Sequence, residues 1–431
     1  MSELVVIAMT GPGLQALEFA RTAGHRTTWV HSPRYDFLMS PEQRERGRVL
    51  ADRMVTLADL HDIPAVLDGL RSAGVDPGSV GGVLSPVHPG AMPAARLAAR
   101  LGLPGTSPEI MGTAKNKARC REILDEAGIP SLRFGVATTL EQAREVIAGI
   151  GLPVIIKPVT GIGKAVTTLA RTDSDVRRHF ATVAEMAGRL APGMAAELDG
   201  RFLIEELAVG PLYSVEVAAD DRRITPLVAV RRKTGRENPV LELGSTVPAG
   251  LPADAEREMY DYVAGVCRAI GLGAGVFHVE IMWTAAGPRL IEVNPRIAGG
   301  AIPDLVAAAT GRNLFELLVR LTSGEPAPDG PLPQLAGASH SFITAARDCT
   351  VRADLPGGWF EEFRPRLHSG YSSIKAGARL RQMTTNMDVL GVVRVISGTP
   401  QEAERECTGL MAEIETTLGI ELTQPAVLDP A

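Results

Sequence analysis

The stretches Phe277–Trp283 (FHVEIMW) and Arg289–Gly300 (RLIEVNPRIAGG) decide the fold. Each begins with alternating apolar and polar residues, which predicts two β-strands joined by a turn. Side chains two residues apart on a strand share a face, so Glu292 and Asn294 are expected to point the same way, with Glu280 on the partner strand. Carboxylates within apolar strands are costly unless they are paired or bind a metal ion. The hairpin therefore predicts a polar site in an otherwise buried sheet.

The polar face of this hairpin offers the oxygen ligands that Mg²⁺ prefers. Glu280 and Glu292 supply carboxylates and Asn294 an amide oxygen, and phosphate oxygens can complete such a coordination sphere. Arg296 follows close by. The alternative is a surface hairpin whose charged positions face solvent. His278 shares the face of Glu280, and we expect a hydrogen-bonded structural histidine there rather than a metal ligand.

A second pattern is Val154–Lys164 (VIIKPVTGIGK), an apolar strand that ends in a lysine and a glycine-bearing turn. Lys157 supplies positive charge, and Gly161 and Gly163 allow backbone N–H groups to approach phosphate oxygens. The G-x-x-x-x-G-K-[ST] pattern of a Walker loop is absent. By itself the stretch is equally compatible with an ordinary glycine turn.

A third pattern is Arg201–Val217 (RFLIEELAVGPLYSVEV), where an apolar run ends in Glu205 and Glu206 and a β pattern soon resumes. A hinge of this kind can hold an adenine ring through backbone groups between apolar walls. The same letters also occur in ordinary helices, so this pattern is weak when taken alone.

The N-terminal part alternates short apolar strands with helices, which predicts a parallel, doubly wound unit. Gly11, Gly13 and Ala16 form a G-x-G-x-x-A pattern after its first strand, a weak signal for a dinucleotide. The segment Ser32–Gly47 is expected to be irregular and to lack a strand that would present a ribose-binding acid, so we interpret the pattern as a tight strand-to-helix turn. His88 follows a later predicted strand and is a candidate for the wall of a substrate pocket.

The bulk composition is that of an ordinary globular enzyme of two to four domains. The chain has 431 residues, 45% of them apolar, and a net charge of −6, which favours neither nucleic acid nor a polybasic membrane contact. None of the four cysteines has a C-x-x-C spacing, and reduced thiols are expected. Neither a signal peptide nor a run of about 18 apolar residues is present, so a cytoplasmic location is expected.

Together and in this order, the three patterns resemble the ATP-grasp superfamily. Within it the chain is most similar to the L-amino acid ligases, through Glu237–Pro252, the hairpin with its RIAGGAIP continuation, and Asn386–Ala403. The resemblance implies an α/β ATP-grasp fold with an N-terminal Rossmann-like domain, a two-part central ATP-binding domain and a C-terminal α/β unit. The corresponding residue ranges are 1–105, 106–200, 201–325 and 326–431.

The resemblance also implies roles for particular residues. ATP and two Mg²⁺ ions are the implied cofactors. Many family members carry a ribose-binding acid where this chain has Leu212, so Glu216 is a candidate for that contact. The implied roles are nucleotide-binding lysines at Lys117 and Lys157, a phosphate-covering loop with Gly161 and Gly163, an adenine hinge at Glu205, Glu206 and Leu207, metal ligands at Glu280, Glu292 and Asn294, and stabilisation of the transferred phosphate by Arg296.

The basic stretch Val228–Gly244 is the candidate substrate-binding segment. The stretch supplies Arg231, Arg232, Lys233 and Arg236, one of which could hold a substrate carboxylate through two hydrogen bonds, with Arg231 and Arg232 as the named candidates. Glu242 could hold a substrate ammonium. A solvated basic turn is the alternative. Whether an α-carboxylate or a side-chain carboxylate is activated stays open at this point.

The expected activity is ligation of an amino acid carboxylate to the amine of a second amino acid through an acyl-phosphate, with release of ADP and phosphate. The first alternative is a carboxylase or purine-pathway type enzyme that activates bicarbonate or formate. The second is an inactive nucleotide-binding regulatory protein, and the third is an oxidoreductase that uses the G-x-G-x-x-A turn. The expected partners are amino acids, with no nucleic acid or membrane, and a homodimer is plausible by resemblance alone.

Overall fold

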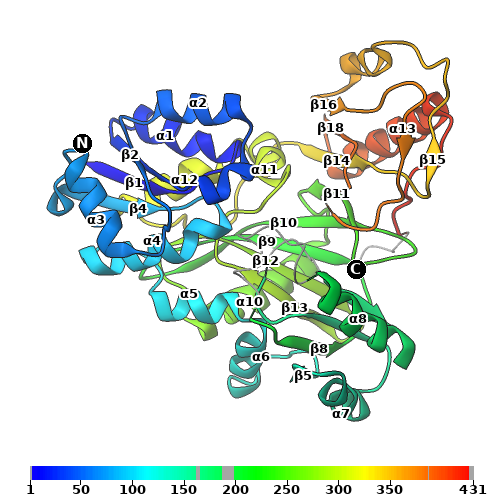
Figure 1. Cartoon of the computed structure of the whole chain (residues 1–431), viewed down its shortest axis with the longest axis horizontal. Coiled ribbons are helices and arrows are strands. Elements are labelled where there is room, and N and C mark those ends of the chain that lie inside the picture. Colours follow the sequence, from blue (N-terminus) through cyan, green and yellow to red (C-terminus); the bar gives the residue numbers. More distant parts are fainter. Residues whose placement is uncertain (1, 162–165, 187–198, 387, 427–431) are drawn as a thin grey trace.

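The computed structural model describes residues 2–161, 166–186, 199–386 and 388–426. Figure 1 shows an N-terminal part (blue), a central part (cyan to yellow-green) and a C-terminal part (orange and red). The mixed α/β architecture predicted from the sequence is confirmed. Within the described ranges, no helix has both the length and the apolar character needed to cross a membrane.

The N-terminal part is built on a parallel sheet with the strand order β3-β2-β1-β4. Its central strand β1 is buried along its whole length, as expected for an apolar strand covered on both faces. The elements are β1 (Glu3–Ile7), η1 (Pro12–Leu14), α1 (Gln15–Thr22), β2 (Arg26–His31), η2 (Pro33–Leu38), α2 (Pro41–Leu50), β3 (Arg53–Thr56), α3 (Ile63–Ser72), η3 (Pro77–Ser79), β4 (Val80–Leu84), α4 (His88–Leu101) and α5 (Pro108–Lys115).

The segment Ser32–Gly47, expected to be irregular, is largely helical, and β3 after it has no counterpart among the predicted strands. A capping box explains α2: Ser40 Oγ accepts from Gln43 N, and the Gln43 side chain accepts from Ser40 N. Gln43 also covers the G-x-G turn, because a Cβ on Gly11 would lie 2.3 Å from its side-chain nitrogen. A protein side chain therefore fills the place over the turn, which does not favour the dinucleotide alternative.

The central part begins with a four-stranded antiparallel sheet in the order β5-β8-β6-β7. Helix α6 begins at Lys117, because Asn116 ends α5 and caps α6 by accepting a hydrogen bond from Arg119 N. The elements are α6 (Lys117–Glu126), β5 (Phe134–Ala137), α7 (Leu140–Ile150), β6 (Val154–Pro158), β7 (Thr168–Ala170), α8 (Asp173–Met186) and β8 (Phe202–Glu206).

A large sheet in the order β13-β12-β9-β10-β11-β14-β18-β16 forms the rest of the framework. Its strands come from both the central and the C-terminal parts of the chain. The elements are β9 (Leu212–Ala219), β10 (Ile224–Thr234), β11 (Glu242–Val247), α10 (Ala253–Ile270), β12 (Gly275–Thr284), β13 (Gly287–Asn294), α11 (Ile302–Thr310), α12 (Leu314–Thr322), β14 (Gly337–Ile343), β15 (Cys349–Thr350), η4 (Trp359–Glu362), η5 (Arg364–Arg366), β16 (Ser369–Ser372), β17 (Arg379–Leu380), β18 (Gly391–Ser397) and α13 (Pro400–Leu418).

Two of the expected domain boundaries do not coincide with boundaries between sheets. β8 pairs with β5 and β6, so the four-stranded antiparallel sheet extends to Glu206 rather than ending at residue 200. The boundary expected at residues 325 and 326 separates no sheets, because β14 pairs with β11. The physical reason is that backbone hydrogen bonds pair strands from both sides of each expected boundary. The local sequence pattern does not show which strands pair.

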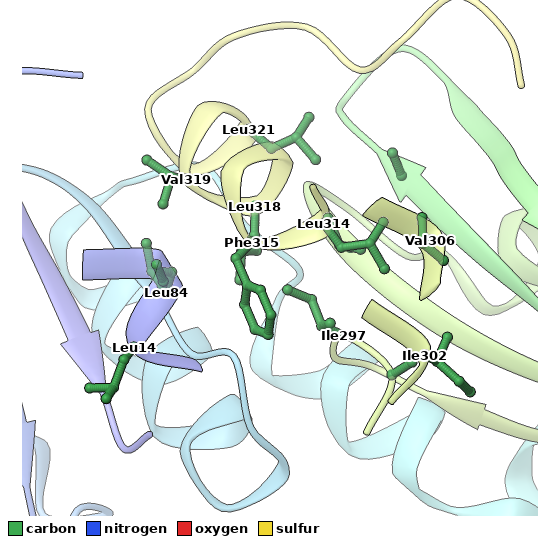
Figure 2. Close-up of a cluster of buried hydrophobic side chains, with 14 of the residues drawn as sticks. Leu14, Leu84, Ile297, Ile302, Val306, Leu314, Phe315, Leu318, Val319 and Leu321 are labelled. Carbon is green, nitrogen blue, oxygen red and sulfur yellow. The ribbon is translucent and has the colours of Figure 1, made fainter. Parts of the chain in front are cut away.

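A buried apolar cluster joins the N-terminal part to the large sheet and anchors the segment after β13 (Figure 2). Leu14 and Leu84 contribute from the N-terminal part, and Phe315 contributes from α12. Ile297 and Ile302 belong to the same cluster. The segment between them is therefore held at both ends by apolar packing, which fixes the position of Arg296 next to it.

Candidate active site

A cavity of about 350 Å³ lies between the four-stranded sheet and the large sheet. Most of the predicted site residues line it, although they come from distant parts of the chain. Gly163 lies outside the described residues. The predicted residues at the cavity wall are Lys117, Lys157, Gly161, Glu205, Glu206, Leu207, Arg232, Glu242, Glu280, Glu292, Asn294 and Arg296.

The hairpin of β12 and β13 places its polar residues as the alternation predicts. Glu280 lies directly opposite Glu292, and His278 lies opposite Asn294. Arg296 reaches back to this face, where its Nη2 donates to Asn294 Oδ1 at 3.2 Å, while its Nη1 donates to Ile297 O at 2.8 Å. Two carboxylates, an amide oxygen and a guanidinium therefore meet at one wall of the cavity.

This donor set fits Mg²⁺ in its chemistry, with oxygen atoms from Glu280, Glu292 and Asn294. At present the carboxylates have protein partners: Lys117 Nζ lies 3.3 Å from Glu292 Oε2, and Arg232 Nη1 lies 3.7 Å from Glu280 Oε1. In the part of the chain that the structure describes, no three acidic, histidine or cysteine side chains already converge on one point. Binding of a metal ion would therefore replace these ion pairs.

Lys157 is the next-to-last residue of β6, lines the cavity and is 6% exposed. It forms an ion pair with Glu205 and donates to Ile291 O at 3.3 Å. Burial lowers the pKa of Lys157, and the neighbouring Glu205 carboxylate opposes that shift. The lysine is thus held in place by a carboxylate and by a backbone carbonyl of β13.

Arg121 on α6 is a residue of this site that sequence reasoning missed. It has no exposed surface, and its Nη2 donates to Glu205 Oε2 at 3.1 Å and to Ile291 O at 3.0 Å. Burial would raise the pKa of Glu205, but Lys157 and Arg121 outweigh burial and hold it below the usual value. The spacing of Arg121 four residues after Lys117 places it one helical turn further along α6, the only signal that could have identified it.

The hinge residues differ in what their side chains do. Glu205 points to Lys157 and Arg121, so any adenine contact at this position would fall to its backbone. Glu206 pairs with Arg133 at 2.8 Å, and Leu207 N donates to Pro153 O at 3.3 Å. The apolar residues that line this end of the cavity are Leu132, Ile155, Leu207 and Leu212.

Glu216 does not line the cavity and is fully buried. It lies opposite His278 on the neighbouring strand, and its Oε1 lies 2.6 Å from His278 Nδ1. Burial favours neutral His278, but Glu216 and Glu280 raise its pKa to about 9. Glu216 is therefore placed to orient His278 and not to contact ribose, which corrects the expected role, and His278 is hydrogen-bonded as predicted.

Two of the four expected substrate-binding residues lie away from the cavity. Arg231 is adjacent to Arg232 on β10, so its side chain faces the other side of the sheet, where it lies 3.4 Å from Glu404. His88 is buried at the first position of α4 and does not line the cavity. Arg232 and Glu242 both line it and form an ion pair with each other.

Comparisons with known proteins identify a domain within the chain. Residues 150–304 match the family model of the ATP-grasp domain. Carnosine synthase 1 of Gallus gallus is 30% identical over 285 residues, which cover 63% of this chain and 30% of that protein. The chain spans about half the length, or less, of the curated relatives that it matches.

Solved structures share the fold over nearly the whole chain. The L-amino acid ligase of Bacillus licheniformis is similar with a TM-score of 0.73 and 20% identity, over 96% of this chain and 98% of that one. The N5-carboxyaminoimidazole synthetase of Staphylococcus aureus is similar with a TM-score of 0.69 and 15% identity, over 95% and 97% of the two chains. Residues 150–304 therefore match the ATP-grasp domain, and the chain as a whole shares the fold of these solved structures.

Proposed function

We propose that the protein is an ATP-dependent carboxylate–amine ligase that joins two amino acids through an acyl-phosphate and releases ADP and phosphate. The observation that carries the proposal is the single cavity at which Lys117, Lys157, the acidic pair Glu280 and Glu292, and Arg296 meet. Such a set suits transfer of a phosphoryl group to an anionic acceptor, because negative charge must be neutralised at several points at once.

In the first step, a carboxylate oxygen of one substrate attacks the γ-phosphorus of ATP. The bond between that phosphorus and the oxygen bridging to the β-phosphate breaks, so that ADP leaves and an acyl-phosphate forms. Lys157 and Arg296 are the cations of this chain that would neutralise the charge spread over the phosphoryl oxygens. When bound at Glu280, Glu292 and Asn294, Mg²⁺ would supply further positive charge at the phosphates.

In the second step, the uncharged amine of the other substrate attacks the acyl carbon. The carbon–oxygen bond to phosphate breaks, inorganic phosphate leaves, and the nitrogen loses a proton as the amide forms. The acyl-phosphate must be shielded from water in the interval. Gly161 at the cavity wall begins the loop that we propose as the cover.

Amino acids as substrates are supported by two observations. Arg232 and Glu242 line the cavity as a paired cation and anion, the two charges needed to recognise a carboxylate and an ammonium. The names of the similar proteins, carnosine synthase and L-amino acid ligase, indicate products of the same chemical class.

The test is phosphate release from MgATP with a panel of amino acids supplied singly and in pairs, with the nucleotide products separated. We expect ADP and phosphate only with particular pairs, together with a product of the mass of their amide. Turnover that depends on bicarbonate or formate instead would support the carboxylase or purine-pathway alternative. ATP binding without turnover under every condition would support a regulatory protein.

A further inference from the structure

One end of the cavity is formed by residues that the proposed chemistry leaves unused. Ser245, His340, Phe342 and Asn386 line it, and we refer to these four residues as the Ser245 end of the cavity. Ser245 on β11 lies opposite Arg232 on β10 and opposite His340 on β14. Directly opposed residues of antiparallel strands share a face, so these side chains form one polar row across the sheet.

Two polar atoms of this row are buried without a partner. Ser245 is 1% exposed and His340 is 2% exposed. Among the described residues, neither Ser245 Oγ nor His340 Nδ1 has a hydrogen-bond partner. Buried polar groups are nearly always hydrogen-bonded, so two unsatisfied atoms beside one cavity indicate a ligand that satisfies at least one of them.

Two cations near this row, Lys233 and Arg394, have no acidic partner among the described residues, whereas Arg232 in the row pairs with Glu242. Lys233 follows Arg232 on β10, so its buried side chain lies on the face of the sheet opposite this row. There its Nζ donates to Ser339 Oγ at 2.9 Å, to Ser341 Oγ at 3.2 Å and to His340 O at 3.3 Å, all of them uncharged acceptors. Arg394 lies opposite His340 on β18 and donates to Ser369 Oγ at 3.2 Å, and its Nε has no partner among the described residues.

Within the described ranges, no acidic side chain lies within ion-pair distance of Lys233 or Arg394. Burial together with Lys233, Arg232 and Arg394 holds the pKa of His340 well below its usual range, as expected in a positive field. Buried charges are normally paired, so this uncompensated charge favours an anionic ligand.

We propose that the Ser245 end of the cavity binds a carboxylate group of one amino acid substrate, other than the carboxylate that is phosphorylated. This inference rests on the proposed function. The Ser245 hydroxyl would donate to the carboxylate. Asn386 Oδ1 accepts from Glu242 N at 3.0 Å. The side-chain N–H groups of Asn386 would then donate a second hydrogen bond to the carboxylate. Lys233 and Arg394 would supply the balancing charge without touching the ligand.

The test compares ligands that differ only in having a carboxylate or a carboxamide. The pairs are L-alanine with L-alaninamide and L-glutamate with L-glutamine, each as the varied substrate at fixed ionic strength. For one pair we expect the wild-type KM to be lower for the carboxylate by roughly tenfold or more, since a hydrogen bond to a charged group contributes about 1.5–3 kcal/mol. The difference is expected in KM rather than in kcat.

Three variants separate the contributions. Ser245→Ala is expected to remove most of the carboxylate preference while it keeps the fold, because it deletes a hydroxyl that has no partner. Lys233→Met is expected to reduce the same preference through the field alone. Lys375→Gln removes an exposed lysine of the C-terminal part and serves as the matched control, with the preference unchanged.

The thermal unfolding midpoint in the presence of the same four compounds gives a reading that needs no turnover. A carboxylate preference in binding without ligase activity for any pair would leave this site standing and overturn the proposed function. Ligase activity without any preference for the carboxylate, or a preference that Ser245→Ala leaves intact, would overturn this site alone.

Discussion

At the scale of single residues, ion pairs hold the charged side chains of the site in place. Glu205 is shared by Lys157 and Arg121, and both cations also donate to Ile291 O. The group contains two cations and one anion, so one positive charge is left over beside the cavity. Because Arg121 also pairs with Glu205, we expect part of the positive charge of Lys157 to remain for the phosphate groups.

Arg121→Met is expected to raise the KM for ATP by roughly tenfold or more, since Glu205 would then cancel the charge of Lys157 and each 1.4 kcal/mol is a factor of ten. Removing one partner of a buried ion pair also costs about 3–5 kcal/mol of stability. Arg121→Lys, which keeps the charge, should partly restore the KM. Arg119→Met removes a half-exposed arginine of the same helix as the control.

A KM for ATP that is unchanged in folded Arg121→Met would show that Arg121 has a structural role only. Circular dichroism at the assay temperature establishes whether the variant is folded.

Glu292→Gln is expected to lower ADP formation by at least about a hundredfold, a typical loss when one electrostatic contact to the transition state is removed. The fold should persist, because the Lys117–Glu292 pair is partly exposed, with 22% of the Glu292 side chain accessible. Glu258→Gln, on the exposed face of α10, is the matched control. Normal turnover of Glu292→Gln would remove Glu292 from the proposed metal site.

At the scale of elements, the regular strands and helices of the site could be predicted because their patterns are local. The hairpin of β12 and β13 lies where the sequence predicts it. His340, Ser245 and Arg121 could not be found in this way, since they join the site only through pairing between distant strands or helix packing. Arg231 and Arg232 are a further example. The sequence does not show which of the two faces the cavity, because that depends on the register of β10 in the sheet.

The sheet of β5–β8 is expected to lose stability in mild acid through His179 on α8. The ring is 3% exposed, lies 2.8 Å from Thr168 Oγ1, and packs edge-on against Phe202. Burial lowers its pKa from 6.5 to about 4. The unfolded chain binds the proton more readily, so stability is full above pH 6.5 and falls as the pH decreases toward 4.

The loss over this range should reach about 3 kcal/mol, from 1.36 kcal/mol for each unit of pKa difference. Urea unfolding between pH 7 and pH 4.5 measures it, and His179→Gln should flatten the dependence in this window. An equal slope in both proteins would contradict the assignment to His179.

Phe315 on α12 is the element-scale test of how the Arg296 segment is anchored. It is 2% exposed in the cluster that contains Ile297 and Ile302 (Figure 2). Phe315→Ala should cost about 3–5 kcal/mol of unfolding free energy, because it leaves a cavity in a packed core. We also expect kcat to fall more than the KM for ATP rises, because Arg296 would lose its fixed position. A kcat that stays at the wild-type value would show that packing of α12 does not position Arg296.

At the scale of the whole molecule, one cavity is enclosed by parts of the chain that are far apart in sequence. Lys157 and the hinge come from the four-stranded sheet, the acidic pair comes from the middle of the large sheet, and His340 and Asn386 come from its C-terminal strands and loops. The large sheet joins the central and C-terminal parts, as Figure 1 shows. In the proposed reaction both substrates would therefore meet ATP at one cavity.

The central claim is that the carboxylate is activated as an acyl-phosphate. The direct measurement uses the first amino acid pair that supports turnover, with ¹⁸O in the carboxylate that is activated. The account predicts that one ¹⁸O atom per turnover appears in inorganic phosphate, because that oxygen attacks the γ-phosphorus and leaves with it. Label in AMP, or inorganic phosphate free of label while the amide forms, would contradict it.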